Sequence, residues 1–293
     1  MDIVKSVGVL GPEGTNGHFA FGRFQHRFYD ELKASQPVFV QSHSDILRGL
    51  EDGRFDCGVV PIENCTTGLI GDVANFWAGS GRSSRIVAEQ WIGISHCMVG
   101  HRGTAAVDRI ISDPRAYEQC RSKLTQSKLL VREHAVELAN STGEAARLIS
   151  MSLVGNGKAA IASRFAAGIY KLEVLEKDMN DSHANATRFH LLCRLDLALK
   201  FKRDKLPAKL AIAFGLEHRP RAQSDVLCLL ALSGANITCN NSIALGVNER
   251  YAFYMELTDC KFEWSDLKPI LAGITRDLKL GGEFGQFNEV VYP

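Results

Sequence analysis

The sequence predicts an α/β protein built from two domains. Its 293 residues fit two domains at the usual size of about 150 residues each. Over residues 1–200, short apolar runs alternate with stretches of helical periodicity, which is typical of a parallel sheet covered by helices on both faces. Residues 206–293 instead follow a βαββαβ order, the split βαβ plan of ferredoxin-like domains.

Composition excludes several classes of protein. A hydrophobic content of 45% and a charged content of 23% are those of an ordinary globular protein and exclude disorder as the main state. The 34 Lys and Arg nearly balance the 33 Asp and Glu, and no dense basic run occurs, so we expect no nucleic-acid partner. The first ten residues lack the pattern of a signal peptide, and no apolar stretch is long enough to span a bilayer. We therefore expect a cytoplasmic protein with no membrane partner.

The cysteines indicate neither a metal site nor a disulfide framework. They contain no C-x-x-C pair and no zinc-like spacing with histidine. Most lie in apolar runs, where a free cysteine behaves as a small hydrophobic residue. We expect all of them to be reduced thiols and expect no metal. The eight positions are Cys57, Cys65, Cys97, Cys120, Cys193, Cys228, Cys239 and Cys260.

The first βα segment places two loops at the ends of strands. Its expected elements are, in order, a strand at 6–10, a helix at 18–32, a strand at 38–40, a helix at 44–53 and a strand at 57–62. The segments 11–15 and 61–68 both begin where a strand stops. Because ligands collect at the carboxyl ends of parallel strands, both segments are candidates for lining one cleft.

A second αβ unit begins after a composition break at 77–84. Gly79-Ser80-Gly81 resembles part of a phosphate loop, but Ser84 stands where a third glycine would be needed, so we expect no nucleotide site. Ser141 and Glu144 have the spacing of a capping box at the start of a helix. The expected elements are strands at 92–99, 109–112, 129–133 and 159–162, with helices at 114–123 and 142–152.

A charged segment at 200–205, ending at Pro207, is expected to link the two domains. The second domain should contain strands at 209–215, 236–244, 250–257 and 285–291, with helices at 223–232 and 265–278. Such a module has no deep cleft of its own and commonly pairs with another copy of itself.

The polar residues at the predicted strand ends indicate the class of ligand. Most are neutral hydrogen-bonding groups, and Arg188 is the clearest fixed cation. This set suits a small anionic, oxygen-rich ligand and is poorly suited to nucleophilic or metal catalysis. The residues are Thr15, Glu63, Asn64, Thr66, Ser112, Gln119, Asn185, Thr187 and Arg188.

Five motifs in order identify a family resemblance. They are Gly11-Pro12-Glu13-Gly14-Thr15, Pro61-Ile62-Glu63-Asn64, Ser112-x-Pro114 with Gln119-Cys120, Ser141-Thr142, and Asn185-x-Thr187-Arg188-Phe189. In this order they resemble prephenate dehydratases, and the βαββαβ segment resembles the ACT regulatory domain of that family. The resemblance implies a catalytic domain at 1–200 with two lobes similar to periplasmic binding proteins. Lobe 1 would comprise 1–80 and 183–198, lobe 2 would comprise 85–178, and the ACT domain would comprise 206–293.

The resemblance also implies residue roles. The family's catalytic threonine falls on Thr187, and its active-site asparagine, serine and glutamine fall on Asn64, Ser112 and Gln119. The implied reaction removes CO2 and water from prephenate to give phenylpyruvate for phenylalanine biosynthesis, with no cofactor. Thr187 would donate a hydrogen bond to the leaving oxygen, and Arg188 would either pair with a substrate carboxylate or form a structural ion pair. The expected substrate-binding residues are Thr15, Glu63, Thr66, Arg188 and Phe189.

Departures from the family pattern leave alternatives open. Gly17, Cys65, Asp113 and Arg115 stand where the family usually has a hydroxyl residue, Ser or Thr, His, and Gln. A prephenate decarboxylase, an arogenate dehydratase and a non-catalytic amino-acid sensor are the alternatives. Retention of the Pro-Ile-Glu-Asn and Thr-Arg-Phe motifs favours the dehydratase.

The effector motifs of the second domain are degenerate. In the family, phenylalanine binds between paired ACT domains through a Gly-Ala-Leu and a Glu-Ser-Arg-Pro segment. Here Arg221-Ala222-Gln223 and Asn241-Ser242-Ile243-Ala244 stand in their places. The candidate effector residues Arg221, Gln223, Asn241 and Ser242 therefore predict weak or absent phenylalanine binding. By the same resemblance we expect a homodimer or homotetramer.

Overall fold

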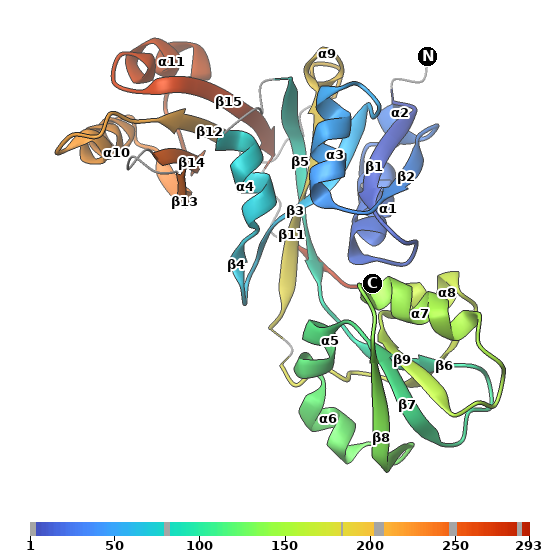
Figure 1. The fold of residues 1–293 in the computed structure, drawn as a ribbon. Coiled ribbons are helices and arrows are strands. Elements are labelled where there is room, and N and C mark those ends of the chain that lie inside the picture. Colours follow the sequence, from blue (N-terminus) through green and yellow to red (C-terminus); the bar gives the residue numbers. More distant parts are fainter. Residues whose placement is uncertain (1–3, 79–82, 183, 202–207, 246–250, 286–288) are drawn as a thin grey trace.

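The computed structural model describes residues 4–78, 83–182, 184–201, 208–245, 251–285 and 289–293. Within these residues it contains three sheets, of seven, five and four strands. The first two belong to two lobes of one domain, and the third forms a separate module beside the first lobe (Figure 1). The predicted α/β class, with two lobes followed by a βαββαβ module, is confirmed.

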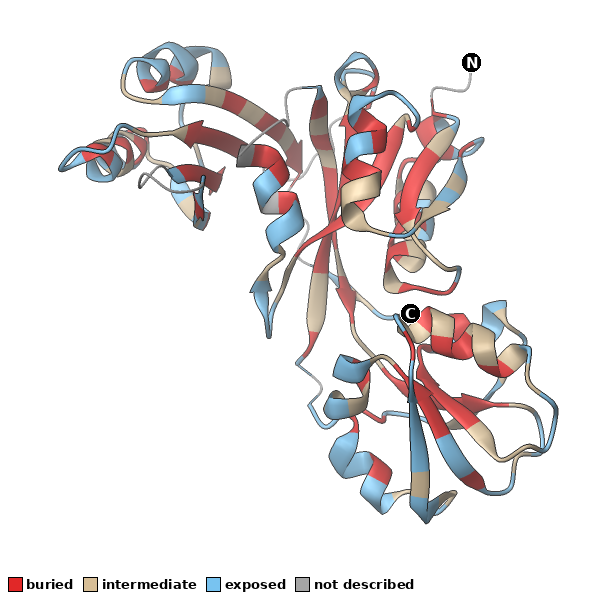
Figure 2. Ribbon diagram, viewed as in Figure 1, coloured by how far each residue is buried: buried red, intermediate tan, exposed pale blue. Residues whose placement is uncertain are grey.

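The first lobe is built on the seven-stranded sheet, in the order β16-β5-β11-β3-β1-β2 with β4 beside β3. Its buried residues run along the central strands (Figure 2). The strands are β1 Ser6–Leu10, β2 Gln36–Val40, β3 Cys57–Asn64, β4 Gly68–Leu69, β5 Ser84–Gly93, β11 Ala186–Arg194 and β16 Val290–Val291. The helices are α1 Asn16–Arg27, α2 Tyr29–Leu32, α3 His43–Glu51, α4 Gly71–Ala78 and α9 Leu195–Ala198.

The predicted helix at 18–32 is two helices in the structure. The chain leaves helical geometry at Phe28, whose φ and ψ are −111° and 53°. Phe28 is buried and stacks edge to face on Phe201. Apolar spacing continues across the break because both helices pack on the same core, so periodicity alone cannot locate it.

The second lobe carries the five-stranded sheet in the order β10-β6-β9-β7-β8. Its strands are β6 Cys97–Gly100, β7 Val107–Ser112, β8 Leu130–Leu138, β9 Lys158–Ala162 and β10 Glu173–Glu176. Its helices are α5 Pro114–Gln119, α6 Arg121–Gln126, α7 Thr142–Ser150 and α8 Arg164–Ile169. Of these, α8 and β10 are absent from the sequence-based prediction. The predicted helix at 114–123 is interrupted at Cys120, where α5 ends and α6 begins.

The predicted boundary between the lobes requires correction. The strand expected at 92–99 is two strands, β5 and β6, separated by a crossing between the lobes. β5 pairs antiparallel with β11 from Ser84 to Gly93, and therefore belongs to the sheet of the first lobe. The second lobe thus begins close to Cys97 rather than at residue 85. The chain returns through Asn185 into β11.

The third sheet has the ferredoxin-like order β13-β14-β12-β15. Its strands are β12 Ala208–Gly215, β13 Asn236–Ala244, β14 Tyr251–Thr258 and β15 Arg276–Gly285, and its helices are α10 Ala222–Leu232 and α11 Trp264–Ala272. Two predictions at the end of the chain are wrong. The helix expected to reach residue 278 stops at Ala272, and the short strand near 290 joins β5 of the first lobe instead of this sheet. Most of the expected linker, residues 202–207, lies outside the described residues.

The ferredoxin-like module packs against the first lobe through one face of its sheet. Trp77 of α4 is fully buried and stacks on Tyr254 of β14, with ring centroids 6.4 Å apart. Phe76, Ala213 and Phe284 belong to the same apolar cluster. Helices α10 and α11 form a separate core with the opposite face. Because the apolar contact is continuous, the module and the first lobe share one core.

One prediction about cysteines is also corrected. The structure has a disulfide between Cys57 of β3 and Cys193 of β11, so these two are not free thiols. The pairing follows from the sheet, because β3 and β11 are antiparallel neighbours that place these residues directly opposite each other. The other six cysteines are free. In the described part of the chain, no helix has both the length and the apolar content to cross a membrane.

Candidate active site

A cavity of about 300 Å³ lies where the two lobes face each other. Its walls come from the strand ends and helix starts of both lobes and from the crossing between them. The residues from the first lobe are Leu10, Thr15, Asn16, Gly17, His43, Val59, Pro61, Asn64, Thr67, Ile70, Thr187 and Phe189. The remainder are Ile94, His96, Asp113, Arg115, Ala116, Gln119, Asn140, Ser141, Thr142 and Asn185.

Thr187 and Asn64 form a hydrogen-bonded pair in this cavity. They lie opposite each other in the β11–β3 register. The Asn64 Nδ2 donates to Thr187 Oγ1 at 3.0 Å and to Asn185 Oδ1 at 2.8 Å. Thr187 Oγ1 therefore accepts a hydrogen bond from the protein but donates none to any described residue. Its own proton remains available to a molecule in the cavity.

The other end of the Asn64 amide is fixed by backbone. Its Oδ1 accepts from the backbone nitrogens of Thr66 at 2.9 Å and Thr67 at 3.1 Å. The orientation of the amide is thereby determined, with its NH2 group toward Thr187. Such a preorganised donor needs no rearrangement when charge develops on a nearby oxygen.

The N-cap residues of three helices line the cavity. Thr15 caps α1 by accepting from the His18 backbone nitrogen, and Ser141 caps α7 by accepting from the Glu144 nitrogen. Asp113 caps α5 in the same way. The amino end of a helix carries partial positive charge and unpaired N–H groups, which favour anions. The caps of α1 and α7 belong to different lobes, and both Thr15 and Ser141 line the cavity. An anion in the cavity therefore faces the amino ends of helices from both lobes.

Gln119 is oriented by a buried histidine. Its Oε1 lies 3.0 Å from His96 Nε2, which requires the tautomer with a proton on Nε2. Burial lowers the pKa of His96, with smaller opposing effects from Gln119 and Asp113. A neutral His96 that donates to the Gln119 oxygen leaves the Gln119 NH2 group to donate elsewhere.

Arg115 and His43 also line the cavity, although neither belongs to the predicted set of site residues. Arg115 lines it with a side chain that is 83% exposed, and its Nε lies 3.9 Å from Asp113 Oδ1. His43 lies at the start of α3. Burial lowers the pKa of His43, Asp72 raises it, and Arg115 lowers it further. Among the described residues that line the cavity, Arg115 is the one lysine or arginine.

Five predicted site residues line the cavity and four do not. Those in the cavity are Thr187, Asn64, Gln119, Thr15 and Phe189. Ser112 is the last residue of β7, two residues before α5 begins. It is fully buried, and its hydroxyl donates to the Asp113 carbonyl, so it does not reach the cavity. Thr66 lies outside the lining residues and is exposed, whereas its neighbour Thr67 lines the cavity.

Arg188 and Glu63 point away from the cavity, which corrects their predicted role in binding substrate. Successive side chains of a strand alternate between its faces, so Arg188 lies opposite to Thr187 and Phe189. Arg188 is 2% exposed, and its Nε donates to Glu63 Oε1 at 3.0 Å. The structural ion pair, which was the other alternative for Arg188, is what the structure shows.

Sequence reasoning missed His43 and Asn140. Two residues separate His43 from the end of β2, and one residue separates Asn140 from the end of β8. Both strands end at the cleft, so the rule that ligands collect at strand ends could have found them. The prediction ends β2 correctly at Val40. It ends β8 at 133, five residues before the strand ends at Leu138.

Comparison with known proteins agrees with the sequence motifs. The family model for prephenate dehydratase matches residues 7–196. The bifunctional chorismate mutase/prephenate dehydratase of Escherichia coli (strain K12) is 27% identical over 292 residues, which covers 97% of this chain and 72% of that protein. The chloroplastic arogenate dehydratase/prephenate dehydratase 2 of Arabidopsis thaliana is 34% identical over 205 residues, which covers 69% of this chain and 51% of that protein.

Solved structures share the fold over nearly the whole chain. The structure of GqqA, described as a novel type of quorum quenching acylase, superimposes with a TM-score of 0.75 at 21% identity and covers 97% of this chain and 98% of its own. A prephenate dehydratase from Arthrobacter aurescens in complex with L-Phe has a TM-score of 0.74 at 22% identity, covering 96% of this chain and 90% of its own. At these identities the superpositions establish the fold alone.

Proposed function

The chain belongs to the prephenate dehydratase family, and we propose on this premise that it converts prephenate into phenylpyruvate in L-phenylalanine biosynthesis. The enzyme is a carbon–oxygen lyase. The observation that carries the residue assignment is the pair of Thr187 and Asn64 in the cavity between the lobes, with the Thr187 proton free to donate. No cofactor is part of the proposal.

The reaction needs little covalent chemistry from the protein. The bond from the ring to its carboxylate breaks, its electron pair enters the ring, and the C–O bond at C4 breaks as hydroxide leaves. Aromatisation of the ring provides most of the driving force. Thr187 donates a hydrogen bond to the departing oxygen, and Asn64 keeps the hydroxyl in place. Gln119 adds a second neutral donor in the same cavity.

The two carboxylates of the substrate require other partners than Arg188. We assign them to the amino ends of α1 and α7 and to Arg115, which all line the cavity. Because the Arg115 side chain is largely exposed, its contribution to binding is modest.

Arg115→Gln is expected to raise KM for prephenate roughly three- to fivefold with kcat nearly unchanged, which corresponds to ~1 kcal/mol of binding. Steady-state kinetics at low salt would measure it. Arg121→Gln is the matched control, because Arg121 is similarly exposed on α6 and pairs with Glu118 outside the cavity. A fall in kcat at constant KM would contradict a binding role for Arg115.

The proposed activity is tested by mixing the purified protein with prephenate and recording the ultraviolet absorbance of phenylpyruvate in alkali. A parallel reaction with arogenate measures the preference between the two substrates. Release of CO2 without phenylpyruvate would identify a decarboxylase. Binding of prephenate without any product would identify a sensor. Either outcome would overturn the dehydratase assignment.

We also propose that the chain forms a homodimer or homotetramer in the cytoplasm through its ferredoxin-like module, acting as an ACT domain. Two features of the described module support this. Helix α10 has only apolar residues from Val226 to Leu232, with Leu232 84% exposed, and β13 is an edge strand of its sheet. A monomeric mass by light scattering at micromolar protein would contradict the proposed assembly.

A further inference from the structure

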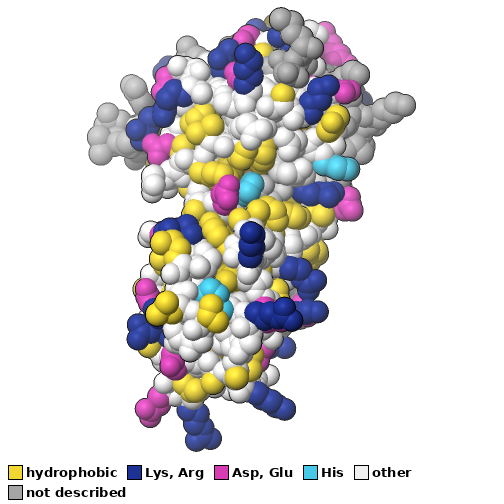
Figure 3. All heavy atoms as spheres, turned by 90° about the vertical axis from the view of Figure 1, so that its right-hand side faces the viewer, with side chains coloured by type: hydrophobic (Ala, Val, Ile, Leu, Met, Phe, Trp, Pro, Cys, Tyr) yellow, Lys and Arg dark blue, Asp and Glu magenta, His cyan; other side chains and the backbone are white. Residues whose placement is uncertain are grey.

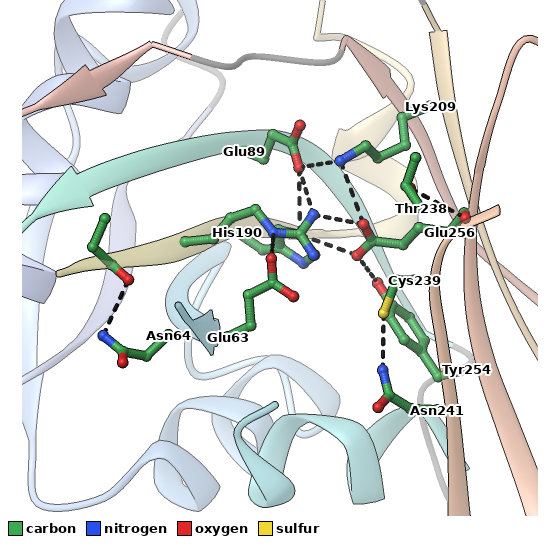
Figure 4. A network of polar contacts seen from close by, with 12 residues as sticks. Glu63, Asn64, Glu89, His190, Lys209, Thr238, Cys239, Asn241, Tyr254 and Glu256 are labelled. Atoms are coloured by element: carbon green, nitrogen blue, oxygen red, sulfur yellow. Dashed lines mark hydrogen bonds and ion pairs between the residues drawn. The ribbon is translucent and has the colours of Figure 1, made fainter. Parts of the chain in front are cut away.

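A buried cluster of charged side chains lies directly behind the catalytic pair. Arg188 follows Thr187 on β11, and Glu63 precedes Asn64 on β3. Because side chains alternate along a strand, Thr187 and Asn64 face the cleft while Arg188 and Glu63 face the ferredoxin-like module. Figure 4 shows the cluster, with Asn64 on one side and the strands of the module on the other.

Arg188 is held by carboxylates from three strands of the molecule. Its Nε donates to Glu63 Oε1 at 3.0 Å, and its Nη1 lies 2.7 Å from Glu89 Oε2 and 2.5 Å from Glu256 Oε2. Glu63 and Glu89 belong to the first lobe, whereas Glu256 lies on β14 of the module. Burial alone would lower the pKa of Arg188, but Glu256 and Glu89 raise it above its usual value. The guanidinium therefore stays charged and anchored in several directions.

The module contributes a cation and a hydroxyl to the same cluster. Lys209 of β12 places its Nζ 2.9 Å from Glu89 Oε2 and 3.4 Å from Glu256 Oε2. Tyr254 donates to Glu256 Oε1 at 2.7 Å. Two buried cations thus face two fully buried carboxylates, Glu89 and Glu256, with Glu63 at the partly exposed edge. Removal of one charge would leave the others unbalanced where solvent screens little.

The backbone beside the Thr187–Asn64 pair is irregular on the strand that carries Asn64. The β11–β3 register shifts between Arg188 and Phe189, so the regular ladder is interrupted one residue from Thr187. Bulges of this kind re-aim side chains and are common next to active sites. The extra residue, Ile62, lies on β3, so the irregularity adjoins Glu63 and Asn64, whereas β11 pairs regularly with β5 from Ala186 to Leu191.

We propose that Glu256 and Lys209 of the ferredoxin-like module are positioning residues, which set the Thr187–Asn64 geometry through Arg188 and Glu63. The inference rests on the proposed function and extends it, because it makes the second domain part of the catalytic arrangement. A purely structural cluster would hold the two domains together without affecting turnover per folded molecule. A positioning cluster affects kcat while leaving KM nearly constant, since the walls that hold the substrate carboxylates lie elsewhere.

The test compares the full-length protein with Glu256→Gln, Lys209→Met and the double variant. We expect Glu256→Gln to lower kcat by about tenfold or more with KM within about twofold, because small displacements of reacting groups are costly. The double variant removes one carboxylate and one cation, restores the charge balance, and is expected to recover most of kcat. Glu217→Gln is the matched control, since Glu217 pairs with Arg276 on the exposed surface of the same module.

The outcomes separate the inference from the proposed function. Without dehydratase activity in the unmodified protein, the proposed function fails. If the unmodified protein is active and folded Glu256→Gln retains kcat within about twofold, the positioning role is overturned. Should Glu256→Gln not fold, Tyr254→Phe takes its place, because it removes only the hydroxyl donated to Glu256 and keeps every charge. An unchanged kcat in that variant would likewise overturn the inference.

Discussion

The hydroxyl of Thr187 has a proton that no described residue accepts. It accepts from Asn64 and donates to no described residue, so its proton can stabilise a departing oxygen. Thr187→Ala removes this donor, and we expect kcat on prephenate to fall by at least about a hundredfold while the protein remains folded. Thr187→Ser keeps the hydroxyl and is expected to retain most of the activity. Full activity in folded Thr187→Ala would refute the assignment.

The contrast between Thr187 and Arg188 shows how far residue types alone can predict a site. The motif correctly placed Thr187 in the cleft. For Arg188 the sequence leaves two roles open, binding a substrate carboxylate or forming a structural ion pair. Because Arg188 follows Thr187 on the same strand, its side chain faces away from the cleft and forms the ion pair. Of the three carboxylates that hold Arg188, Glu63 belongs to a motif, but those of residues 89 and 256 do not, and no local pattern indicates that they would meet Arg188.

His190 gives the folded state a defined response to acid. It is fully buried among Arg188, Lys209, Glu256 and Glu89, and neither ring nitrogen has a hydrogen-bond partner among the described residues. Burial is the main cause that lowers the pKa of His190 to about 3 from 6.5; Glu256 opposes this shift, and Arg188 and Lys209 add to it. The unfolded chain therefore binds this proton at a higher pH than the folded one, so stability falls as pH drops below about 6.5.

We expect His190→Leu to reduce the loss of unfolding free energy between about pH 6.5 and pH 5 by roughly 2 kcal/mol. Urea unfolding at both pH values measures it. The pKa values of His18, His43 and His96 are also lowered chiefly by burial. The variant therefore still loses part of its unfolding free energy as the pH falls. Glu256 acts in a lower window: burial raises its pKa but Arg188 lowers it, to about 2 from 4.5, so its contribution disappears only below about pH 4.5. Equal slopes in the variant and the unmodified protein would refute the role of His190.

Among elements, those with local signals were predicted best. The strand at 6–10 and the strand at 236–244 have the predicted bounds, because each is a run ended by turn or polar residues. The predicted strand at 92–99 failed because one apolar run passes through two sheets. The strand near 290 failed because its partner, β5, lies about 200 residues earlier in the chain. Pairings between distant segments leave no local pattern in the sequence.

The two lobes touch each other where α7 meets the loop before α1. A Cβ on Gly143 would lie 2.9 Å from the Glu13 carbonyl oxygen and 3.1 Å from the Thr15 backbone nitrogen. Tyr170 of the second lobe also donates to the Glu13 carbonyl, at 3.0 Å. The glycine thus permits close approach of the two helix starts that we assign to the substrate carboxylates.

Gly143→Ala is expected to push these helix starts apart and to lower kcat/KM by about tenfold, since displacement of binding groups weakens both binding and alignment. Gly168→Ala is the matched control, because Gly168 lies in a helix of the same lobe and its Cβ would meet nothing within 4 Å. Kinetics that are the same for both variants would show that the contact between the lobes does not control the cleft.

At the scale of the molecule, the second domain is joined to the first lobe by both an apolar core and a charge cluster. Trp77 and Tyr254 belong to the apolar core, and Arg188, Lys209 and Glu256 belong to the charge cluster. Acidic and basic side chains are otherwise scattered over both lobes on the face seen in Figure 3. The module is therefore placed to influence the cleft mechanically, whether or not an effector binds it.

The positions expected to bind an effector argue against phenylalanine. Arg221 adopts a left-handed φ of 69°, the conformation that glycine takes most readily, and its side chain is 82% exposed beside Asp225. By the family resemblance a glycine at this position would let the backbone approach a ligand, whereas Arg221 adds a long cationic side chain there. The amide of Asn241 already donates to Cys239 Sγ at 2.9 Å, and Ser242 is exposed.

We therefore expect no phenylalanine binding in the micromolar range. Calorimetric titration of the full-length protein with phenylalanine measures it, with prephenate as the positive control for an intact sample. Inhibition assays at physiological phenylalanine concentrations should show unchanged dehydratase activity. Micromolar affinity with one site per chain would refute the prediction.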